Sequence, residues 1–262
     1  MAKLSGKTAL VTGAESGIGQ GIAIEFALNG ANVIITYLQD EIAAQQTLAK
    51  VEAIGSKGII VKVDVGDEQQ ASAMFREVLG HFPQIDILVN SAGLRSVDKY
   101  IHEMSFAEYE KTVRVNLFGT FLCCQNFVKH RLQHGGNGRI INITSVHEEV
   151  VSPGKIDYCS SKAALRGLCR ALAMEVADKK ITVNNIAPGM ILTPMNQQAV
   201  NDLEYRKQLE QRIPAKTSGT VQDVAKLAVF LSSDDAAYIT GTTQFIDGGL
   251  MLSRAKGAKW SK

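Results

Sequence analysis

The stretch "TALVTGAESGIGQG", residues 8–21, decides the fold, because it joins a β-branched run directly to a series of closely spaced glycines. The run predicts a short buried strand, and the residues after it predict a helix over 17–29. At the turn between them, Gly13 would permit a tight bend, Gly17 would let backbone N–H groups approach a pyrophosphate, and Gly19 would let the helix lie close to the sheet. The spacing is GxxxGxG rather than GxGxxG, so the stretch alone leaves open a nucleotide-binding turn and a purely structural one.

The rest of the chain alternates short apolar runs with longer amphipathic stretches. The candidate strands are "TALVT", "NVIIT", "GIIVKV", "IDILVN", "GRIINIT", "ITVNNI" and "TQFI". The candidate helices cover 17–29, 40–54, 67–80, 105–132, 156–178 and 221–232. This alternation predicts an α/β fold: a single-domain Rossmann-type, doubly wound parallel seven-stranded sheet with helices on both faces. Residues 189–219 are irregular, with one short helix at most, and an insertion of that length is typical of a substrate lid.

Length and composition narrow the class of protein. A chain of 262 residues with 45% hydrophobic content suits one domain spanning 1–262. The formal net charge of +2 argues against nucleic acid or a membrane as a partner, although residues 253–262 form a basic tail that leaves −2 for the rest. No secretion signal, no CxxC pair among the four cysteines and no membrane-spanning apolar run are present. These features predict a cytoplasmic protein without a metal site.

The segment "SVHEEVVSPGKIDYCSSKAAL", residues 145–165, places Tyr158 four positions before Lys162 in a candidate helix. Residues at i and i+4 share one helical face, so the Lys162 ammonium group can reach over Tyr158. A nearby cation would lower the pKa of the phenol from about 10, which makes Tyr158 a usable proton-transfer group near neutral pH. An exposed helix face is the plain alternative for such a pair. The accompanying Ser145 and Asn116 disfavour it.

Several short motifs follow one another in a fixed order along the chain. They are the glycine turn at 13–19, "DV" at 64–65, "NSAG" at 90–93, "VNLFG" around Asn116, Ser145, "YCSSK" at 158–162 and "PG" at 188–189. Each is weak alone, but their combined order and spacing are highly specific. From about Leu4 to Gly249 the sequence resembles the short-chain dehydrogenase/reductase family. One position departs from the family pattern, because Ser91 stands where the family usually has Asn.

The resemblance implies an NAD(P)-dependent oxidoreductase that moves a hydride between the nicotinamide and a carbon bearing a hydroxyl or carbonyl group. The catalytic residues it implies are Asn116, Ser145, Tyr158 and Lys162. Tyr158 would exchange the proton on the substrate oxygen, and Ser145 would orient that oxygen. Lys162 would also bind the nicotinamide ribose, and Asn116 would hold a water that relays protons.

The resemblance also implies which residues bind the cofactor. They are Gly13, Ser16, Gly17, Ile18, Gly19, Tyr37, Asp64, Val65, Asn90, Ala92, Gly93, Tyr158, Lys162, Pro188, Gly189 and Thr193. NAD-preferring members usually end the second strand with an Asp that bonds the ribose 2′-OH, and here Tyr37 stands in its place. The arginine common in NADP-preferring members is missing too, with Ser16 and Leu38 at its usual positions. The expected cofactor is NADP, with NAD as the other possibility.

The substrate is a small molecule whose class depends on the residues after Ser145. The segment "SVHEEV" is similar to the glucose 1-dehydrogenase branch of the family, which favours a sugar or polyol contacted by Ser145, His147 and Arg95. A solvated pair of His147 and Glu148 is the alternative, and Arg95 could instead pair with Asp98 in solvent. That branch carries an acid near the position of Arg95, so the cation indicates another polyol or an anionic substrate. A 3-oxoacyl-carrier-protein reductase and a non-catalytic dinucleotide-binding scaffold stay open as other functions.

Two long candidate helices, 105–132 and 156–178, carry "FGTFLCC" and "LCRALAMEV". This is more apolar surface than one face of a sheet is expected to cover, although a well-buried helix would look the same. Family members commonly pair these helices across a dimer axis. The resemblance therefore implies a homotetramer.

Overall fold

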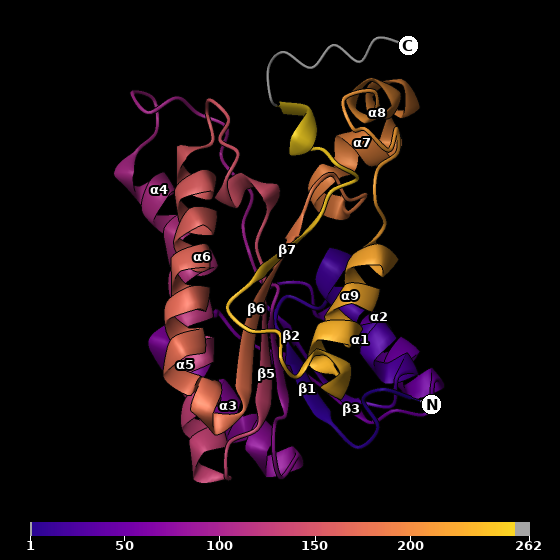
Figure 1. Ribbon diagram of the computed structural model, residues 1–262, viewed down its shortest axis with the longest axis vertical. Coiled ribbons are helices and arrows are strands. Elements are labelled where there is room, and N and C mark those ends of the chain that lie inside the picture. The colour runs from indigo at the N-terminus through magenta and orange to yellow at the C-terminus, as the bar shows by residue number, and fades with distance from the viewer. Residues whose placement is uncertain (1, 255–262) are drawn as a thin grey trace.

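Seven parallel strands form one sheet, in the order β3-β2-β1-β4-β5-β6-β7 (Figure 1). The structure is a computed structural model and describes residues 2–254. The strands are β1 (Thr8–Val11), β2 (Asn32–Tyr37), β3 (Gly58–Lys62), β4 (Ile87–Asn90), β5 (Gly138–Ile143), β6 (Ile181–Pro188) and β7 (Thr243–Ile246). The strand order and the all-parallel pairing confirm the predicted Rossmann-type, doubly wound sheet.

Helices cover both faces of this sheet (Figure 1). One face carries α1 (Gly17–Leu28), α2 (Glu41–Ala53) and α9 (Val221–Ser232). The other carries α3 (Glu68–His81), α4 (Phe106–Val113), α5 (Thr120–Gln133) and α6 (Ile156–Val176). Two short helices, α7 (Gln197–Asn201) and α8 (Leu203–Glu210), lie beyond the carboxyl end of β6, at the top of Figure 1. Within residues 2–254, no helix is long and apolar enough to span a membrane.

The central strands are buried on both faces, so their side chains alternate between two apolar layers. In β1, Ala9 and Val11 belong to the layer that contains Phe26 of α1, whereas Leu10 belongs to the layer that contains Phe127 of α5. Burial on both faces explains why these strands appear in the sequence as continuous apolar runs rather than as alternating ones.

The helix predicted over 105–132 is interrupted in the structure. After α4, a π-helical turn, η1 (Arg114–Gly119), precedes α5. Its last residue, Gly119, lies so close to Val65 that a Cβ would come within 2.7 Å of the valine side chain. Such turns widen a helix locally and frequently occur at functional sites, and this one contains Asn116. The prediction of one continuous helix is wrong here, because no residue pattern marks a π turn.

The segment 189–219 contains more helix than the single short one expected. A 3₁₀ turn, η4 (Pro194–Asn196), leads into α7 and α8. At the base of the segment, Ile191 and Gly219 form a parallel bridge, and Leu192 N–H donates to Gly219 O at 3.2 Å. The base is therefore fixed, and the lid function of the segment stays a prediction. Of the predicted basic tail over 253–262, residues 255–262 lie outside the described part of the chain.

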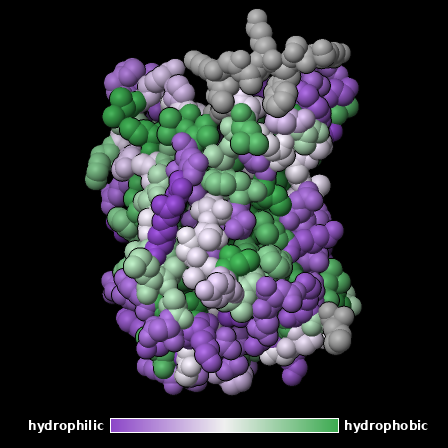
Figure 2. Space-filling model, in the orientation of Figure 1, coloured by the Kyte–Doolittle hydropathy of each residue, from purple (hydrophilic) through white to green (hydrophobic). Residues whose placement is uncertain are grey.

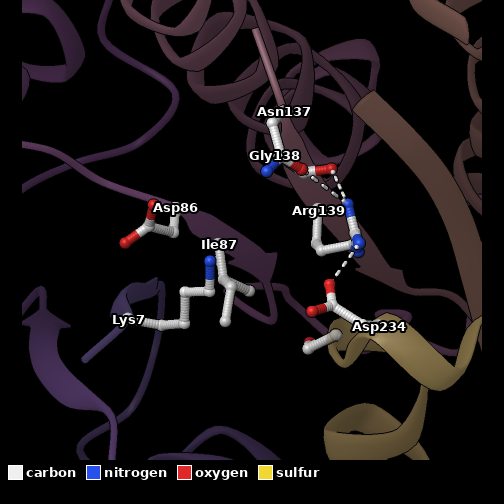
Figure 3. Close-up of a pocket in the computed structure, with 8 residues that line it drawn as sticks. Lys7, Asp86, Ile87, Asn137, Gly138, Arg139 and Asp234 are labelled. Atoms are coloured by element: carbon white, nitrogen blue, oxygen red, sulfur yellow. Dashed lines mark hydrogen bonds and ion pairs between the residues drawn. The ribbon is translucent and has the colours of Figure 1, made fainter. Parts of the chain in front are cut away.

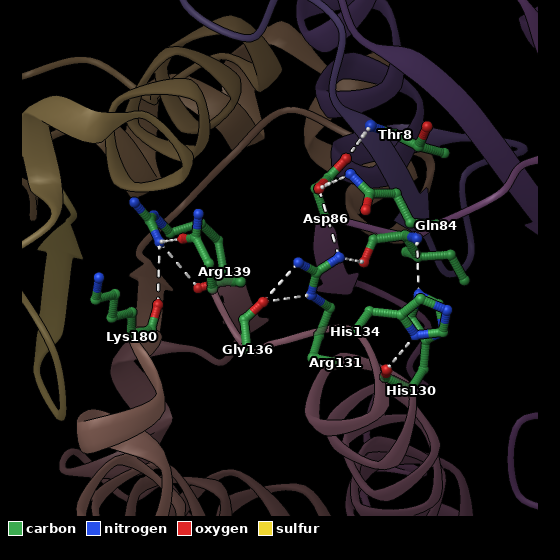
Figure 4. A network of polar contacts seen from close by, with 12 residues as sticks. Thr8, Gln84, Asp86, His130, Arg131, His134, Gly136, Arg139 and Lys180 are labelled. Atoms are coloured by element: carbon green, nitrogen blue, oxygen red, sulfur yellow. Dashed lines mark hydrogen bonds and ion pairs between the residues drawn. The ribbon is translucent and has the colours of Figure 1, made fainter.

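A polar network fastens the amino ends of β4 and β5, at the end of the sheet opposite α7 and α8 (Figure 4). Arg131 of α5 donates to Gly136 O at 2.6 Å and to Ile85 O at 3.2 Å, and it lies 3.5 Å from the Asp86 carboxylate. His130 Nε2 accepts from Ile85 N–H at 3.1 Å. Burial lowers the pKa of His130 to about 4, so this imidazole stays neutral at physiological pH.

A cavity of about 10 Å³ lies at this same end of the sheet (Figure 3). It is lined by Lys7, Asp86, Ile87, Asn137, Gly138, Arg139, Ser232 and Asp234. Arg139 donates to Asp234 at 3.1 Å across one side of it. The volume suits about one water molecule. This cavity is therefore too small for a dinucleotide or a sugar.

Candidate active site

The predicted site residues gather at the carboxyl ends of the central strands. Gly13 follows β1, Asn90 ends β4, Ser145 follows β5 and Pro188 ends β6. The strand order reverses between β1 and β4. In doubly wound sheets, the crevice at such a reversal is where ligands bind.

The glycine turn leaves no room for side chains at Gly13 and Gly19. Gly13 and Gly17 have positive φ angles of 62° and 57°, which glycine adopts without strain. A Cβ on Gly13 would lie 2.8 Å from Ala92 Cα, and one on Gly19 would lie 2.2 Å from Gly13 O. Ser16 precedes α1 without capping it through its side chain, and the first turn of α1 has no acidic residue. The amino end of α1 therefore presents backbone N–H groups, together with Ile18, in a way that fits a dinucleotide pyrophosphate.

Thr12 ties this turn to the "NSAG" segment, although the motif pattern did not single it out. Its Oγ1 accepts hydrogen bonds from the backbone N–H groups of Ser91 and Ala92, both at 3.0 Å. The neighbouring Asn90 donates from Nδ2 to Asn142 Oδ1 at 2.9 Å, so side chains also join β4 to β5. A threonine that ends a strand directly before a glycine turn is the sequence signal that could have indicated this contact.

Acidic side chains surround the end of β2, where Tyr37 is buried. Burial, and then the nearby Glu41 carboxylate, raise the pKa of Tyr37. In the glycine turn, burial and then the Asp40 carboxylate raise the pKa of Glu15. The sequence pattern indicated Tyr37 and the absent arginine as the features that set cofactor preference. It does not indicate these three acids, because their proximity depends on how the turn and α2 meet.

The end of β3 contributes Asp64 and Val65. Asp64 Oδ1 accepts from Gly66 N–H at 2.9 Å, which fixes the carboxylate beside its own loop. Val65 is buried against Gly119 of the π turn. These contacts hold the loop after β3 close to the start of α5.

The segment after β6 returns over the glycine turn. Gly189 N–H donates to Ile246 O at 3.0 Å, directly after Pro188 ends the strand. Thr193 is buried, and its Cβ lies 3.7 Å from the position that a Cβ on Gly17 would take. The structure therefore brings residues 188–193 beside the turn that fits a pyrophosphate.

Asn116 is buried in the π turn and is held by three side-chain hydrogen bonds. Its Oδ1 accepts from Leu94 N–H at 2.7 Å, and its Nδ2 donates to Leu94 O and to Ser161 Oγ, both at 3.1 Å. A Cβ on Gly93 would lie 3.2 Å from Asn116 Oδ1 and 3.8 Å from Lys162 Nζ. The amide therefore joins the loop after β4 to α6, close to the lysine.

Ser145 and Tyr158 form a hydrogen bond through their side chains. Ser145 Oγ also accepts from His147 N–H at 3.2 Å, at the start of the 3₁₀ turn η2 (Val146–Glu148). The imidazole of His147 meets the Tyr158 ring edge-on, with the ring centroids 5.9 Å apart. His147 Nδ1 lies 2.7 Å from Val150 O. Because a carbonyl oxygen can only accept, this contact places a hydrogen on Nδ1.

Lys162 does not act on the Tyr158 hydroxyl in the way the sequence suggested. Its Nζ lies 5.5 Å from the centroid of the Tyr158 ring and donates to Ile143 O at 2.9 Å. Burial raises the pKa of Tyr158 to about 12, and the hydrogen bond with Ser145 is the influence that lowers it. The expectation that the ammonium group favours the phenolate is wrong for this structure, because burial dominates. A phenol that keeps its proton is suited to donating it to a carbonyl oxygen.

The structure places some of the residues expected to contact a substrate beside Tyr158 and others away from it. Arg95 pairs with Asp98 at 3.0 Å, and its side chain is 66% exposed, which is the solvent ion pair considered as an alternative. His147 lies against the Tyr158 ring, whereas the Glu148 side chain is fully buried near Arg166. The interpretation of His147 and Glu148 as a solvated pair is therefore wrong.

One side of the site has an apolar rim. Figure 2 shows apolar residues gathered over α4 and the loops above it. The exposed apolar side chains of these segments are Val97, Tyr100, Ile101, Phe106 and Val151. They belong to the stretches that directly follow Gly93 and Ser145.

Comparison with known proteins gives consistent matches over nearly the whole chain. A family model described as enoyl-(acyl carrier protein) reductase matches residues 13–251. Glucose 1-dehydrogenase 2 of Bacillus subtilis is 38% identical over 249 residues, which are 95% of this chain and 96% of that protein. The 3β-hydroxysteroid dehydrogenase 1 of Eggerthella lenta is 40% identical over 249 residues, or 95% of each chain. A solved structure of a proposed 2-deoxy-D-gluconate 3-dehydrogenase from Agrobacterium tumefaciens, with bound NADP, has a TM-score of 0.87 and 34% identity, covering 95% of this chain and 98% of that one.

Proposed function

The chain belongs to the short-chain dehydrogenase/reductase family and is an oxidoreductase, and we propose that it interconverts a secondary alcohol and its carbonyl, with a sugar or polyol as substrate. The observation that carries this proposal is the convergence of Asn116, Ser145, Tyr158 and Lys162 beside a glycine turn that fits a dinucleotide. A panel of aldoses, polyols and ketones, each offered with both nicotinamide cofactors, tests it.

The nicotinamide cofactor supplies the hydride chemistry when bound, and the protein supplies position and proton transfer. We assign proton exchange at the substrate oxygen to the Tyr158 hydroxyl, and the orientation of that oxygen to Ser145. Lys162 would bind the ribose hydroxyls, and Asn116 would fix a water at the end of the proton path. The residues proposed to hold the cofactor are Gly13, Ser16, Gly17, Ile18, Gly19, Tyr37, Asp64, Val65, Asn90, Ala92, Gly93, Pro188, Gly189 and Thr193.

We propose that the enzyme accepts NADP, and NAD as well. Tyr37 leaves the end of β2 without the carboxylate that would repel a 2′-phosphate. The bound NADP of the Agrobacterium tumefaciens structure supports this choice. Three acids disfavour NADP, because they restore negative charge near the end of β2. They are Glu15, Asp40 and Glu41. These opposing features support dual use rather than strict NADP dependence.

Tyr37→Asp should shift this preference toward NAD. A carboxylate at the end of β2 would face the 2′-phosphate of NADP and accept from the 2′-OH of NAD. We expect the ratio of kcat/KM for NADP to that for NAD to fall by about tenfold or more, which corresponds to about 1.4 kcal/mol. Tyr37→Asn is the matched control, since it makes the same change in size without the charge. An equal ratio in the two variants would contradict the placement of Tyr37 beside the 2′ position.

The substrate class rests on the polar groups around the Tyr158 hydroxyl. Ser145 is hydrogen-bonded to the Tyr158 hydroxyl and the His147 ring meets the Tyr158 ring edge-on, and we propose that Ser145 and His147 bind sugar or polyol hydroxyls. Arg95 could join them only by leaving Asp98. Similarity to glucose 1-dehydrogenase 2 supports the sugar class.

A ketone or alcohol with an apolar body is the second candidate substrate. The exposed apolar side chains beside the site favour it, because a sugar offers little apolar surface to cover them. The similarity to a 3β-hydroxysteroid dehydrogenase points the same way. Of the functions that were left open, a scaffold without activity is disfavoured by the oxidoreductase relatives.

We propose that the protein assembles as a homotetramer and that residues 189–219 close over the substrate. From "FGTFLCC", the side chains of Phe118 and Phe121 are half exposed on α5 and the π turn, and they line a groove of about 680 Å³. From "LCRALAMEV", Met174 is 87% exposed on α6. Both helices therefore present apolar groups that a second copy could cover.

A further inference from the structure

Glu148 is a buried carboxylate that the proposed reaction does not use. It lies three residues after Ser145, on η2, and its side chain is 0% exposed. Neither of its oxygens has a hydrogen-bond partner within residues 2–254. The nearest cation is Arg166, whose Nε lies 3.9 Å from Glu148 Oε1. A carboxylate in such a place is costly unless nearby positive charge compensates it.

The positive charge that faces Glu148 comes from one stripe of α6. Tyr158, Lys162 and Arg166 are spaced at i, i+4 and i+8, so they share one helical face. Burial lowers the pKa of Lys162 to about 8, and the Glu148 carboxylate opposes this shift. One turn farther along α6, burial and then Glu148 raise the pKa of Cys169. The Glu148 carboxylate therefore lies beside this stripe, 3.9 Å from the Nε of Arg166, which follows Lys162 by one helical turn.

The other groups around Lys162 do not replace this charge. Besides Glu148, the groups around Lys162 and its neighbours are Tyr158, Arg166 and Cys169 on α6, His147 and Glu149 on or next to η2, Asn116 on the π turn and Gly93 after β4. The Glu149 carboxylate is engaged by Arg166 Nη1 and is a third exposed. Asn116 is neutral. Among the described residues that surround Lys162, Glu148 is thus the buried acid whose charge acts on it.

We propose that Glu148 is a positioning residue of this site: its buried carboxylate keeps the Lys162 side chain protonated, and so maintains a cation over the Tyr158 ring and beside the place of the nicotinamide ribose. The inference rests on the proposed function for its role in the reaction. The electrostatic effect itself is a property of the protein alone. A buried ammonium group without a nearby negative charge loses its proton at lower pH.

Glu148→Gln tests the effect directly, because it keeps the size of the side chain and removes the charge. Lysine labelled with ¹³C at Cε is incorporated, the Lys162 signal is identified by its loss in Lys162→Arg, and its chemical shift is followed against pH by NMR. In the wild type we expect a midpoint near pH 8, because burial lowers the pKa of Lys162 to about 8. In Glu148→Gln we expect the midpoint to fall by about one pH unit, the usual size of the effect of one nearby opposite charge.

Glu149→Gln is the matched control. It removes the neighbouring carboxylate that pairs with Arg166, but it leaves the buried charge near Lys162 in place. Its Lys162 midpoint should stay at the wild-type value. A wild-type midpoint in Glu148→Gln, or an equal shift in both variants, would overturn the proposal.

A second comparison guards against poor folding of Glu148→Gln, which leaves Glu149 as the remaining acid paired with Arg166. Arg166→Gln is compared with Arg166→Gln/Glu148→Gln, and both are checked by thermal melting. The double variant should have the lower Lys162 midpoint by a similar amount. Equal Lys162 midpoints in Arg166→Gln and in the double variant would contradict the proposal.

The titration needs neither substrate nor cofactor, so it is independent of the proposed function. If the enzyme turns over a member of the substrate panel, the alkaline limb of its kcat/KM profile should move to lower pH in Glu148→Gln by the same shift. A shifted Lys162 midpoint without turnover of any panel member would refute the proposed function and leave the electrostatic inference standing. Turnover of a panel member together with an unshifted Lys162 midpoint in Glu148→Gln would refute the electrostatic inference and leave the proposed function standing.

Discussion

Tyr158→Phe is expected to lower turnover by about 10²- to 10⁴-fold, the usual contribution of general acid–base catalysis. The variant removes the hydroxyl that is hydrogen-bonded to Ser145 and leaves the aromatic ring between His147 and Lys162. The glycine turn is untouched, so binding of NADPH should stay within about twofold of the wild type, a difference well below 1 kcal/mol. Steady-state kinetics on the best substrate of the panel and titration of NADPH fluorescence measure the two effects separately.

Tyr109→Phe provides the matched control for that variant. Tyr109 belongs to α4, and its Oη lies 3.2 Å from the Oγ of Ser160 on α6. It lies outside the group formed by Asn116, Ser145 and Lys162. Loss of its hydroxyl makes the same chemical change and should leave turnover near the wild-type rate. Wild-type turnover in Tyr158→Phe, or an equal loss in both variants, would show that Tyr158 does not transfer the proton.

Gly19→Ala is expected to produce the second large effect, on cofactor binding. The added methyl group would lie 2.2 Å from the backbone oxygen of Gly13, and a backbone group cannot move away without opening the turn. Such overpacking costs about 1–3 kcal/mol. Because the displaced turn is the proposed pyrophosphate site, affinity for NADP and NAD should fall by about tenfold or more.

Gly167→Ala is the control for this change, since it adds the same methyl group to a helical glycine of α6. A Cβ there would meet nothing within 4 Å, so alanine should stabilise the helix by about 0.5–1 kcal/mol and leave cofactor affinity unchanged. Isothermal titration calorimetry and thermal melting measure both variants. If Gly19→Ala binds the cofactor as well as Gly167→Ala does, the turn does not hold the pyrophosphate.

The layered α/β fold could be predicted because local signals agree with the tertiary structure. The apolar runs of the central strands are buried on both faces, as their continuous composition indicated. The helix over 221–232 has the predicted bounds, and its start is set by a reciprocal capping box between Thr220 and Asp223. Tyr158 and Lys162 lie one turn apart on α6, because the i, i+4 spacing requires it.

The remaining features depend on contacts between segments that are far apart in the sequence. The π turn at Asn116 arises where α5 meets the loop after β3, and no residue type specifies it. The raised pKa of Tyr158 follows from burial that only the packed fold creates. Likewise, Glu148 looks like a surface acid in the sequence, yet η2 turns it inward beside Arg166. Spacing therefore predicted which residues meet, while their protonation had to come from the structure.

The central claim, hydride transfer between a nicotinamide and a carbinol carbon, is tested most directly with NADPH and NADH that carry deuterium at both C4 positions. Each labelled cofactor is incubated with the wild-type enzyme and a panel of ketoses, aldoses, oxo-esters and apolar ketones, and mass spectrometry locates the label in the products. The account predicts alcohols with deuterium on the carbinol carbon, formed by the wild type and lost with Tyr158→Phe. An alcohol without deuterium at that carbon, or no product from any panel member while NADPH binds normally, would contradict it.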